Sequence, residues 1–281
     1  MRELERKPSA DDDPSYPCLA IIGQGRVGTA LAAALGADPP GGGRNDAPVS
    51  DSAAGGRRTY AILGPLGRGA DGAGADAVVL CVPDEEIAAA AAVVAPGPLV
   101  GHCSGATPLA VLEPHEAFSL HPLMTVTGAG TTFDGAGAAI AGTTPRALGF
   151  AQALADALGM KAVEVEDRDR AAYHAAASIA SNFLVTLEAA AERVARSAGV
   201  ERELLVPLVR ATVENWAAMG PEQALTGPVA RGDRATVAAQ RAAVAERAGD
   251  LLPLFDTLVQ HTRALARSRT DGSATPPEAA A

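Results

Sequence analysis

A short apolar run near the N-terminus leads directly into a glycine-rich turn, and this junction constrains the fold more than any other part of the chain. The run Cys18–Ile22 is typical of a strand buried on both faces. A GxGxxG pattern follows it and opens an amphipathic helix predicted over residues 27–35. In this context the first glycine permits a tight turn, the second lets a pyrophosphate approach the backbone, and the third allows close helix–strand packing. The helix N-terminus then faces the phosphates. We therefore expect a dinucleotide site on Gly23, Gln24, Gly25, Arg26, Val27 and Gly28.

Short strands alternate with helices up to about residue 166, and only helices follow. Further strands are expected at 60–63, 76–83, 99–103, 118–121 and 162–165, with helices at 85–94 and 145–158. This alternation predicts a parallel, doubly wound sheet. The later helices are expected at 167–199, 201–219, 233–248 and 251–266. The predicted fold class is therefore α/β: an N-terminal Rossmann doubly wound parallel sheet followed by an all-α C-terminal domain.

Changes in composition set the predicted domain boundaries. Residues 1–16 are expected to form a disordered leader, because the acidic stretch at 11–13 cannot bury apolar surface. The dinucleotide-binding domain is expected over 17–166, with a flexible insertion at 37–58 that is rich in glycine and proline. A helical substrate-binding and dimerisation domain is expected over 167–267, and a disordered polar tail over 268–281.

The overall composition argues against several classes of partner. The chain has 23 basic and 33 acidic residues, so its net charge is 23 − 33 = −10, which disfavours a nucleic-acid or anionic-membrane surface. Aromatic residues make up only 3%, which disfavours a stacking platform for single-stranded nucleic acid. The N-terminus lacks the apolar stretch of a secretory signal, and the longest apolar run, 87–95, is too short to span a bilayer.

The three cysteines indicate neither a metal site nor a redox motif. Cys18, Cys81 and Cys103 lie among apolar residues without CxxC-type spacing. We expect reduced, buried thiols, no metal and a cytoplasmic location.

The predicted second strand is followed by a glycine-rich loop without an acidic side chain before Asp71. NAD-binding folds usually place Asp or Glu there to bind the ribose hydroxyls. Arg68 in this loop could instead pair with a 2′-phosphate, so we expect NADP rather than NAD. The alternative for Arg68 is a solvated loop arginine. Val82 and Pro83, which end the next strand, are expected beside the nicotinamide ribose. Asp84 is expected to be a helix N-cap rather than a catalytic group.

Two histidines end predicted strands and therefore point toward the same crevice. Reduction of a carbonyl or imine needs a proton donor near the hydride acceptor, and histidine is the commonest such group near neutral pH. His121 and His102 are both placed to serve, although a structural role is the alternative for each. Ser104 follows His102 and is a further catalytic candidate.

The first long helix carries a polar strip on an alanine-rich background. His174, Ser178, Ser181 and Asn182 fall at helical spacing and should share one face. This face either contacts substrate and nicotinamide or forms a satisfied polar seam. In the first case His174 and Asn182 are catalytic candidates and Ser178 binds substrate. Arg231, in a later loop, is expected to clamp a substrate carboxylate, with an ion pair to Asp233 as its alternative.

Seven stretches, in order over most of residues 18–267, resemble a known family. They are GQGRVGTAL (23–31), GPLGRG (64–69), VVLCVPDEEI (78–87), HCSGA (102–106), SLHPLM (119–124), YHAAASIASN (173–182) and LTGPVARGD (225–233). The chain resembles the bacterial Rossmann-like NADP-dependent oxidoreductases with an uncharacterised helical C-terminal domain. These are distant kin of pyrroline-5-carboxylate reductase, the β-hydroxyacid dehydrogenases and the deazaflavin-dependent NADP reductases. The resemblance implies an NADP-binding domain, a helical domain similar to the C-terminal part of 6-phosphogluconate dehydrogenase, and a homodimer through that domain.

The scarcity of lysine narrows the chemistry that the resemblance implies. Lys7 and Lys161 are the only lysines, and neither lies on the long helix, where the β-hydroxyacid dehydrogenases carry a catalytic lysine. A proton donor must then be a histidine, a serine or water. We therefore expect an NADP-dependent reductase of a C=O or C=N group in a small, carboxylated metabolite, with a ketopantoate-type reductase as one version. The alternatives are a non-catalytic NADP-binding or sensing protein and an NADP:deazaflavin oxidoreductase.

Overall fold

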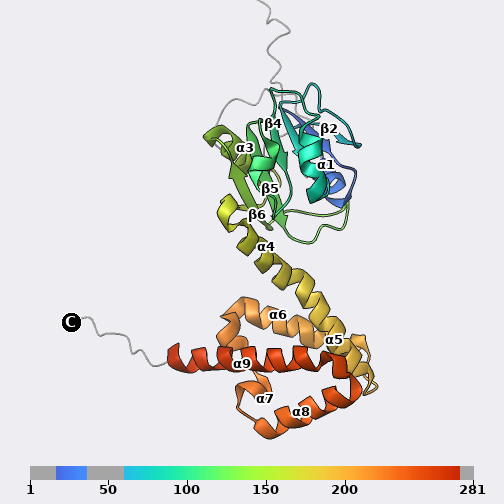
Figure 1. Cartoon of the computed structure of the whole chain (residues 1–281), viewed down its shortest axis with the longest axis vertical. Coiled ribbons are helices and arrows are strands. Elements are labelled where there is room, and N and C mark those ends of the chain that lie inside the picture. The colour runs from blue at the N-terminus through green and yellow to red at the C-terminus, as the bar shows by residue number, and fades with distance from the viewer. Residues whose placement is uncertain (1–16, 37–59, 273–281) are drawn as a thin grey trace, which may run out of the picture. The chain divides into compact units, whose positions relative to one another are not determined.

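The computed structural model describes residues 17–36 and 60–272. The predicted leader at 1–16, the insertion at 37–58 and the part of the predicted tail after Gly272 lie outside the described residues. The described chain forms two compact units that divide between Ile179 and Ala180. Figure 1 labels the elements of both units, the first built around the sheet and the second made of helices.

The first unit contains one seven-stranded sheet in the order β2-β1-β3-β4-β5-β6-β7. The strands are β1 (Cys18–Ile22), β2 (Ala61–Leu66), β3 (Ala77–Leu80), β4 (Leu99–His102), β5 (Ala117–Leu123), β6 (Gly137–Gly142) and β7 (Lys161–Glu164). Strands β1 to β5 are parallel, whereas β6 pairs antiparallel with β5 and parallel with β7. The carboxyl ends of β1 to β5 therefore meet at one edge. The doubly wound sheet is confirmed, with one antiparallel pairing that the sequence pattern did not indicate.

Helices cover both faces of this sheet, as a doubly wound architecture requires. Buried side chains of α1 (Arg26–Gly36) and α3 (Pro145–Ala157) pack against one face. The opposite face packs against α2 (Ile87–Ala91) and the short 3-10 helix η2 (Leu109–Leu112). The predicted helix at 85–94 is shorter than expected, because its first turn is the separate 3-10 helix η1 (Asp84–Glu86).

The long helix predicted over 167–199 is interrupted. A 3-10 turn, η3 (Asp167–Asp169), precedes α4 (Arg170–Ser178), and a π-helical turn, η4 (Ile179–Phe183), separates α4 from α5 (Leu184–Arg196). Ser181 and Asn182 lie within the π turn, outside the regular α-helix that carries His174 and Ser178, so the shared face of the four residues stays a prediction.

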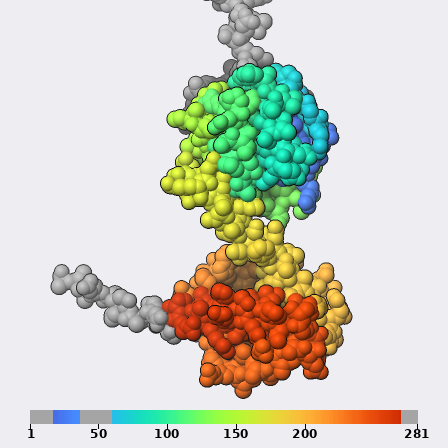
Figure 2. Space-filling view, in the orientation of Figure 1, coloured from blue at the N-terminus to red at the C-terminus, as the bar shows by residue number. Residues whose placement is uncertain are grey.

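The second unit continues with α6 (Arg202–Ala224), α7 (Gly227–Ala230), α8 (Arg234–Arg247), the 3-10 helix η5 (Gly249–Leu251) and α9 (Leu252–Gly272). Helix α9 packs against α6, α7 and α8, and its surface (red) spans the visible face of this unit in Figure 2. Asp233 caps α8, since its side chain accepts the N–H of Thr236, which confirms the predicted cap. Among the residues described, no helix is long and apolar enough to cross a bilayer.

Candidate functional site at the carboxyl edge of the sheet

The glycine-rich turn after β1 contains glycines of two kinds. Gly23 has φ +126°, and a Cβ there would collide with the carbonyl oxygen of Cys81. A Cβ on Gly28 would collide with the carbonyl oxygen of Gly23. Protein packing therefore requires both glycines. A Cβ on Gly25, in contrast, would meet no described atom within 4 Å.

This difference fits the predicted phosphate cradle. Nothing in the described protein demands a glycine at position 25, whereas a pyrophosphate close to the backbone would. The N–H groups in the first turn of α1 have no acceptor within the helix and are oriented to bind an anion. The turn that holds Gly23, Gln24, Gly25, Arg26, Val27 and Gly28 thus has the geometry of a dinucleotide-binding loop.

Arg68 lies just after β2, at the same edge of the sheet. Leu66 is paired with Ile22 of β1, and its carbonyl accepts the N–H of Gly23 at 2.9 Å. The Arg68 side chain is 83% exposed, and its Nη2 lies 2.6 Å from Oε1 of Glu86. Arg68 is therefore next to the glycine-rich turn and is a largely exposed loop residue paired with Glu86, so its pairing with a 2′-phosphate stays a prediction.

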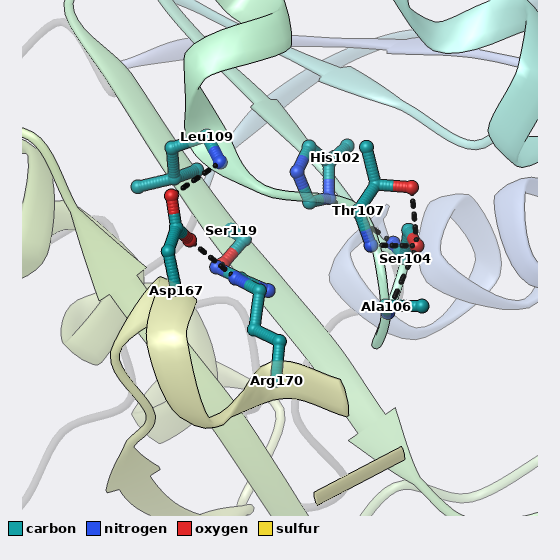
Figure 3. A network of polar contacts seen from close by, with 8 residues as sticks. All are labelled: His102, Ser104, Ala106, Thr107, Leu109, Ser119, Asp167 and Arg170. Atoms are coloured by element: carbon teal, nitrogen blue, oxygen red, sulfur yellow. Dashed lines mark hydrogen bonds and ion pairs between the residues drawn. The ribbon is translucent and has the colours of Figure 1, made fainter. Parts of the chain in front are cut away.

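Asp84 does not cap a helix, so its predicted N-cap role is wrong. Pro83 occupies the cap position of η1, and no side chain makes the capping bond, because the first turn already begins at Asp84. Asp84 Oδ2 lies instead 2.7 Å from the hydroxyl of Ser104, which follows β4. The hydroxyl also accepts the N–H groups of Ala106 and Thr107. Ser104 thus joins the ends of β3 and β4, and Figure 3 shows its bonds to Ala106 and Thr107.

A histidine–tyrosine pair lies at the end of β5. Nδ1 of His121 is 2.7 Å from the hydroxyl of Tyr173 on α4. The ring centroid of His121 is 5.5 Å from that of Tyr173 and 6.2 Å from that of His174. The imidazole also lies against the backbone of Gly105, where a Cβ would come within 2.9 Å of the ring. His121, Tyr173 and His174 are therefore one cluster.

Sequence reasoning selected His121 and His174 but missed Tyr173. A tyrosine beside a histidine on an alanine-rich helix was the only available signal, and nothing in the sequence links it to β5. The polar hydroxyl of a half-buried tyrosine needs a partner, and His121 provides one.

Burial controls the protonation of this cluster. Burial and, to a smaller extent, the nearby His174 together lower the pKa of His121 to about 4, while Asp84 opposes the shift. Burial also raises the pKa of Tyr173, against the opposing charge of Arg170. Both groups are consequently neutral at pH 7. His121 is then an acceptor or donor of a hydrogen bond rather than an imidazolium acid.

A second network lies beside this cluster and is shown in Figure 3. Arg170, which is 3% exposed, bonds Oδ1 of Asp167 through Nε at 2.6 Å and the hydroxyl of Ser119 through Nη2 at 2.6 Å. His102 is fully buried, and its Nδ1 accepts the N–H of Ser104 at 3.2 Å. Burial lowers the pKa of His102 to about 4, with a further contribution from the charge of Arg170.

The predicted site residues divide between the two units. The glycine-rich turn, Arg68, Val82, Pro83, Ser104 and His121 all lie at the carboxyl edge of the sheet, and His174 and Ser178 lie on α4 in the same unit. Ser178 is half-buried at the end of α4. Asn182, on the π turn, and Arg231, just after α7, belong to the second unit, and their roles stay predictions. Within the described ranges, no group of three or more His, Cys, Asp or Glu residues could hold a metal ion.

Comparisons with known proteins add a domain match and a set of similar folds. Residues 137–262 match the model of a domain of unknown function, DUF2520. No curated protein sequence matches the chain. The solved structure of protein TM1727 from Thermotoga maritima has a TM-score of 0.69 at 23% identity, over 90% of this chain and 99% of that one.

Two further structures carry names that indicate a function for those proteins. A proposed NADP oxidoreductase from Bacteroides fragilis has a TM-score of 0.67 at 18% identity, over 89% of this chain and 98% of that one. The pyrroline carboxylate reductase of Plasmodium falciparum, solved with NADP bound, has a TM-score of 0.52 at 11% identity, over 89% and 98%. Identities this low establish the fold alone. The chain therefore has a Rossmann-type fold with a helical C-terminal region, similar in fold to these structures, and its residues 137–262 match the DUF2520 domain model.

Proposed function

We propose that the protein is an NADP-dependent oxidoreductase that reduces a C=O or C=N group of a small, carboxylated metabolite. One observation carries this proposal: the glycine-rich turn and the His121–Tyr173 pair lie at the same edge of one sheet. In open α/β sheets, ligands bind outside the carboxyl ends of the strands. The NADP oxidoreductase and pyrroline carboxylate reductase names of the structural relatives agree with this reaction class.

The turn at 23–28 would hold the pyrophosphate, and Val82 and Pro83 would lie along the nicotinamide ribose. Bound NADPH would supply the hydride. Arg68 would exchange its ion pair with Glu86 for an ion pair with the 2′-phosphate. In the Arg68–Glu86 pair the Arg68 side chain is 83% and the Glu86 side chain 31% exposed, and ion pairs open to solvent contribute little stability, so exchanging Glu86 for a phosphate costs little. This exchange supports NADP over NAD.

Tyr173 and His121 would supply the proton that the reduced substrate needs. Because His121 is neutral at pH 7, the tyrosine hydroxyl is the group of this pair with a proton to donate. Its raised pKa is still below that of an aliphatic alcohol, so the hydroxyl can protonate the alkoxide that hydride transfer to a carbonyl would form. His121 holds the hydroxyl in place, and His174 borders the pair.

The remaining predicted residues take supporting roles in this proposal. Ser178 and Arg231 would bind the substrate, with Arg231 on its carboxylate, and Asn182 would assist from the π turn. Ser104 would hold the strand ends through Asp84. A ketopantoate-type reductase is one concrete version. The three described cysteines are free thiols, which agrees with a cytoplasmic enzyme.

The second unit presents an apolar surface that supports a homodimer. Leu204, Leu208, Trp216 and Met219 on α6 are between 44% and 71% exposed. At 100° per residue they fall on one side of the helix. A contiguous apolar surface of this kind usually marks an interface. We propose that a second copy of the chain covers it.

The function is tested by NADPH oxidation with a panel of keto acids and imino acids. We expect turnover with at least one compound and its loss in Tyr173→Phe. Tight NADPH binding without turnover on the whole panel would contradict the reductase and favour a non-catalytic NADP sensor. Reduction of a deazaflavin by NADPH, with no activity on the panel, would favour the NADP:deazaflavin oxidoreductase.

A further inference from the structure

Two side-chain pairs fasten the start of α4 to β5. Arg170 bonds Ser119 at 2.6 Å, and Tyr173 bonds His121 at 2.7 Å. Ser119 and His121 are two residues apart on the strand and so point to the same face. Arg170 and Tyr173 are three residues apart on the helix and so share one side. The two bonds therefore join the same face of β5 to the same side of α4.

Arg170 connects this contact to the rest of the first unit. Its Nε bonds Oδ1 of Asp167, and Oδ2 of Asp167 accepts the N–H of Leu109 at 3.0 Å. One buried guanidinium thereby ties together β5, η3 and the turn that begins η2, as Figure 3 shows. The guanidinium is planar with donors in a fixed fork, so these bonds specify the orientation of the helix start and not only its proximity.

A purely structural role explains this arrangement less well. Burying the charge of a guanidinium is costly, and well-packed apolar side chains of similar volume often give equal or greater stability. An apolar contact would hold α4 near the sheet without fixing where Tyr173 falls along β5. The ion pair between the buried Arg170 and the 40% exposed Asp167 fixes that position, and it does so one helical turn from the tyrosine.

We propose that Arg170 is a positioning residue that holds α4 in register on β5, so that the Tyr173 hydroxyl meets Nδ1 of His121. Its part in catalysis rests on the proposed reductase function, whereas the docking of α4 does not. His102 and His121 lie beside this contact, and burial lowers the pKa of each to about 4. Their titration midpoints should therefore respond when the contact is changed. For His102, Arg170 lowers the pKa while Asp84 and Asp167 raise it. For His121, His174 and Arg170 lower the pKa while Asp84 raises it.

The test compares Arg170→Lys and Arg170→Met with Arg168→Met, which removes a 75% exposed arginine from the same turn as a control. Histidine titrations are followed by NMR in the full chain. In Arg170→Lys the charge remains but the fork is lost, so we expect the His121 midpoint to rise from about 4 toward 6.5 while that of His102 stays low. In Arg170→Met both midpoints should rise. The control should leave both unchanged.

Ser119→Ala provides a second route if an Arg170 variant does not fold. It removes the β5 end of the contact and keeps the Arg170–Asp167 ion pair, so the His121 midpoint should again rise, by less than in Arg170→Lys. An unchanged His121 midpoint in folded Ser119→Ala and Arg170→Lys would overturn the proposal.

Kinetics separate this inference from the proposed function. We expect Arg170→Lys to lower kcat about 10- to 100-fold through misplacement of the tyrosine, with KM for NADPH unchanged. A shifted His121 midpoint in a protein whose wild type reduces no substrate would leave the docking role standing and reject the reductase. An active wild type with unchanged kcat in the folded variants would reject the positioning role alone.

Discussion

The hydroxyl of Tyr173 lies 2.7 Å from Nδ1 of His121, although 52 residues of chain separate them. His121 lies near the end of strand β5, and Tyr173 lies in the first turn of helix α4, which leads toward the second unit. Because burial keeps both neutral at pH 7, the bond joins two uncharged groups, and in the proposed reductase the tyrosine is the proton donor.

Removing that hydroxyl should abolish most of the reductase activity. We expect Tyr173→Phe to lower kcat by about 100-fold or more, as is typical when a positioned proton donor is lost. The affinity for NADPH should not change, because the glycine-rich turn is untouched. Steady-state kinetics and a fluorescence titration with NADPH measure the two quantities. Equal kcat values for wild type and variant would show that another group donates the proton.

The stability of the protein should fall as the pH drops from 6.5 toward 4. His102 and His121 are neutral in the folded protein down to about pH 4, while in the unfolded chain they take up protons near pH 6.5. The unfolded state thus binds more protons in this window, so the free energy of unfolding rises with pH there. Each histidine contributes at most about 3 kcal/mol, and the half-buried His121 contributes less.

Urea unfolding at pH 7 and pH 5 tests this pH dependence. His121→Gln removes one of the two histidines. The free energy of unfolding should therefore change less between pH 7 and pH 5 than it does in the wild type. His115→Gln, at a histidine outside the cluster, serves as the matched control and should leave it as in the wild type. If the stability of His121→Gln depends on pH as strongly as that of the wild type, His121 does not contribute to the pH dependence.

The glycines of the turn should respond differently to the same substitution. Gly25→Ala places a methyl group where no described atom lies within 4 Å, so folding should be unaffected. The same methyl group stands in the way of a pyrophosphate, so the Kd for NADPH should rise about tenfold or more, equivalent to about 1.4 kcal/mol.

Gly28→Ala is the matched contrast, since its Cβ would collide with the carbonyl oxygen of Gly23. We expect it to lower the free energy of unfolding by about 1–3 kcal/mol through overpacking. Thermal unfolding and NADPH titration of both variants separate the two effects. If Gly25→Ala binds NADPH as tightly as the wild type, the cofactor does not approach the backbone there.

Arg68 should distinguish NADPH from NADH. Arg68→Ala should weaken NADPH binding about tenfold by removing a charge-assisted contact, and leave NADH binding unchanged. Glu86→Gln removes the competing carboxylate and should strengthen NADPH binding. Stability should change little in either variant, because the arginine side of the ion pair is 83% exposed and solvent screens the pair. A wild-type protein that prefers NADH would refute the role of Arg68.

Much of the sheet could be predicted because its strands are continuous apolar runs between turn residues. Strand β6 was missed because its sequence, Gly-Ala-Ala-Ile-Ala-Gly, consists mostly of residues with low strand propensity, and its pairing with β5 is a tertiary contact. The π turn at Ile179–Phe183 has no sequence signature, and it interrupts the single helix that was predicted over 167–199. The glycine-rich turn could be predicted because its expected role depends on backbone geometry, which the positions of the glycines indicate. The contacts of Tyr173 and Arg170 were not, because each depends on a residue about 50 positions away on β5.

The apolar side of α6 should be buried between two copies of the chain. Leu208 is 65% exposed and lies amid the other apolar residues of that side, so Leu208→Arg would place a charge within an apolar interface. We expect this variant to be monomeric at concentrations where the wild type is a dimer, as measured by light scattering coupled to size-exclusion chromatography. Arg210→Ala, at an arginine two positions along the same helix and therefore on another side, is the control and should remain a dimer.

A wild type that stays monomeric at high concentration would rule out this interface, and a dimer that persists in Leu208→Arg would show that another surface forms the dimer.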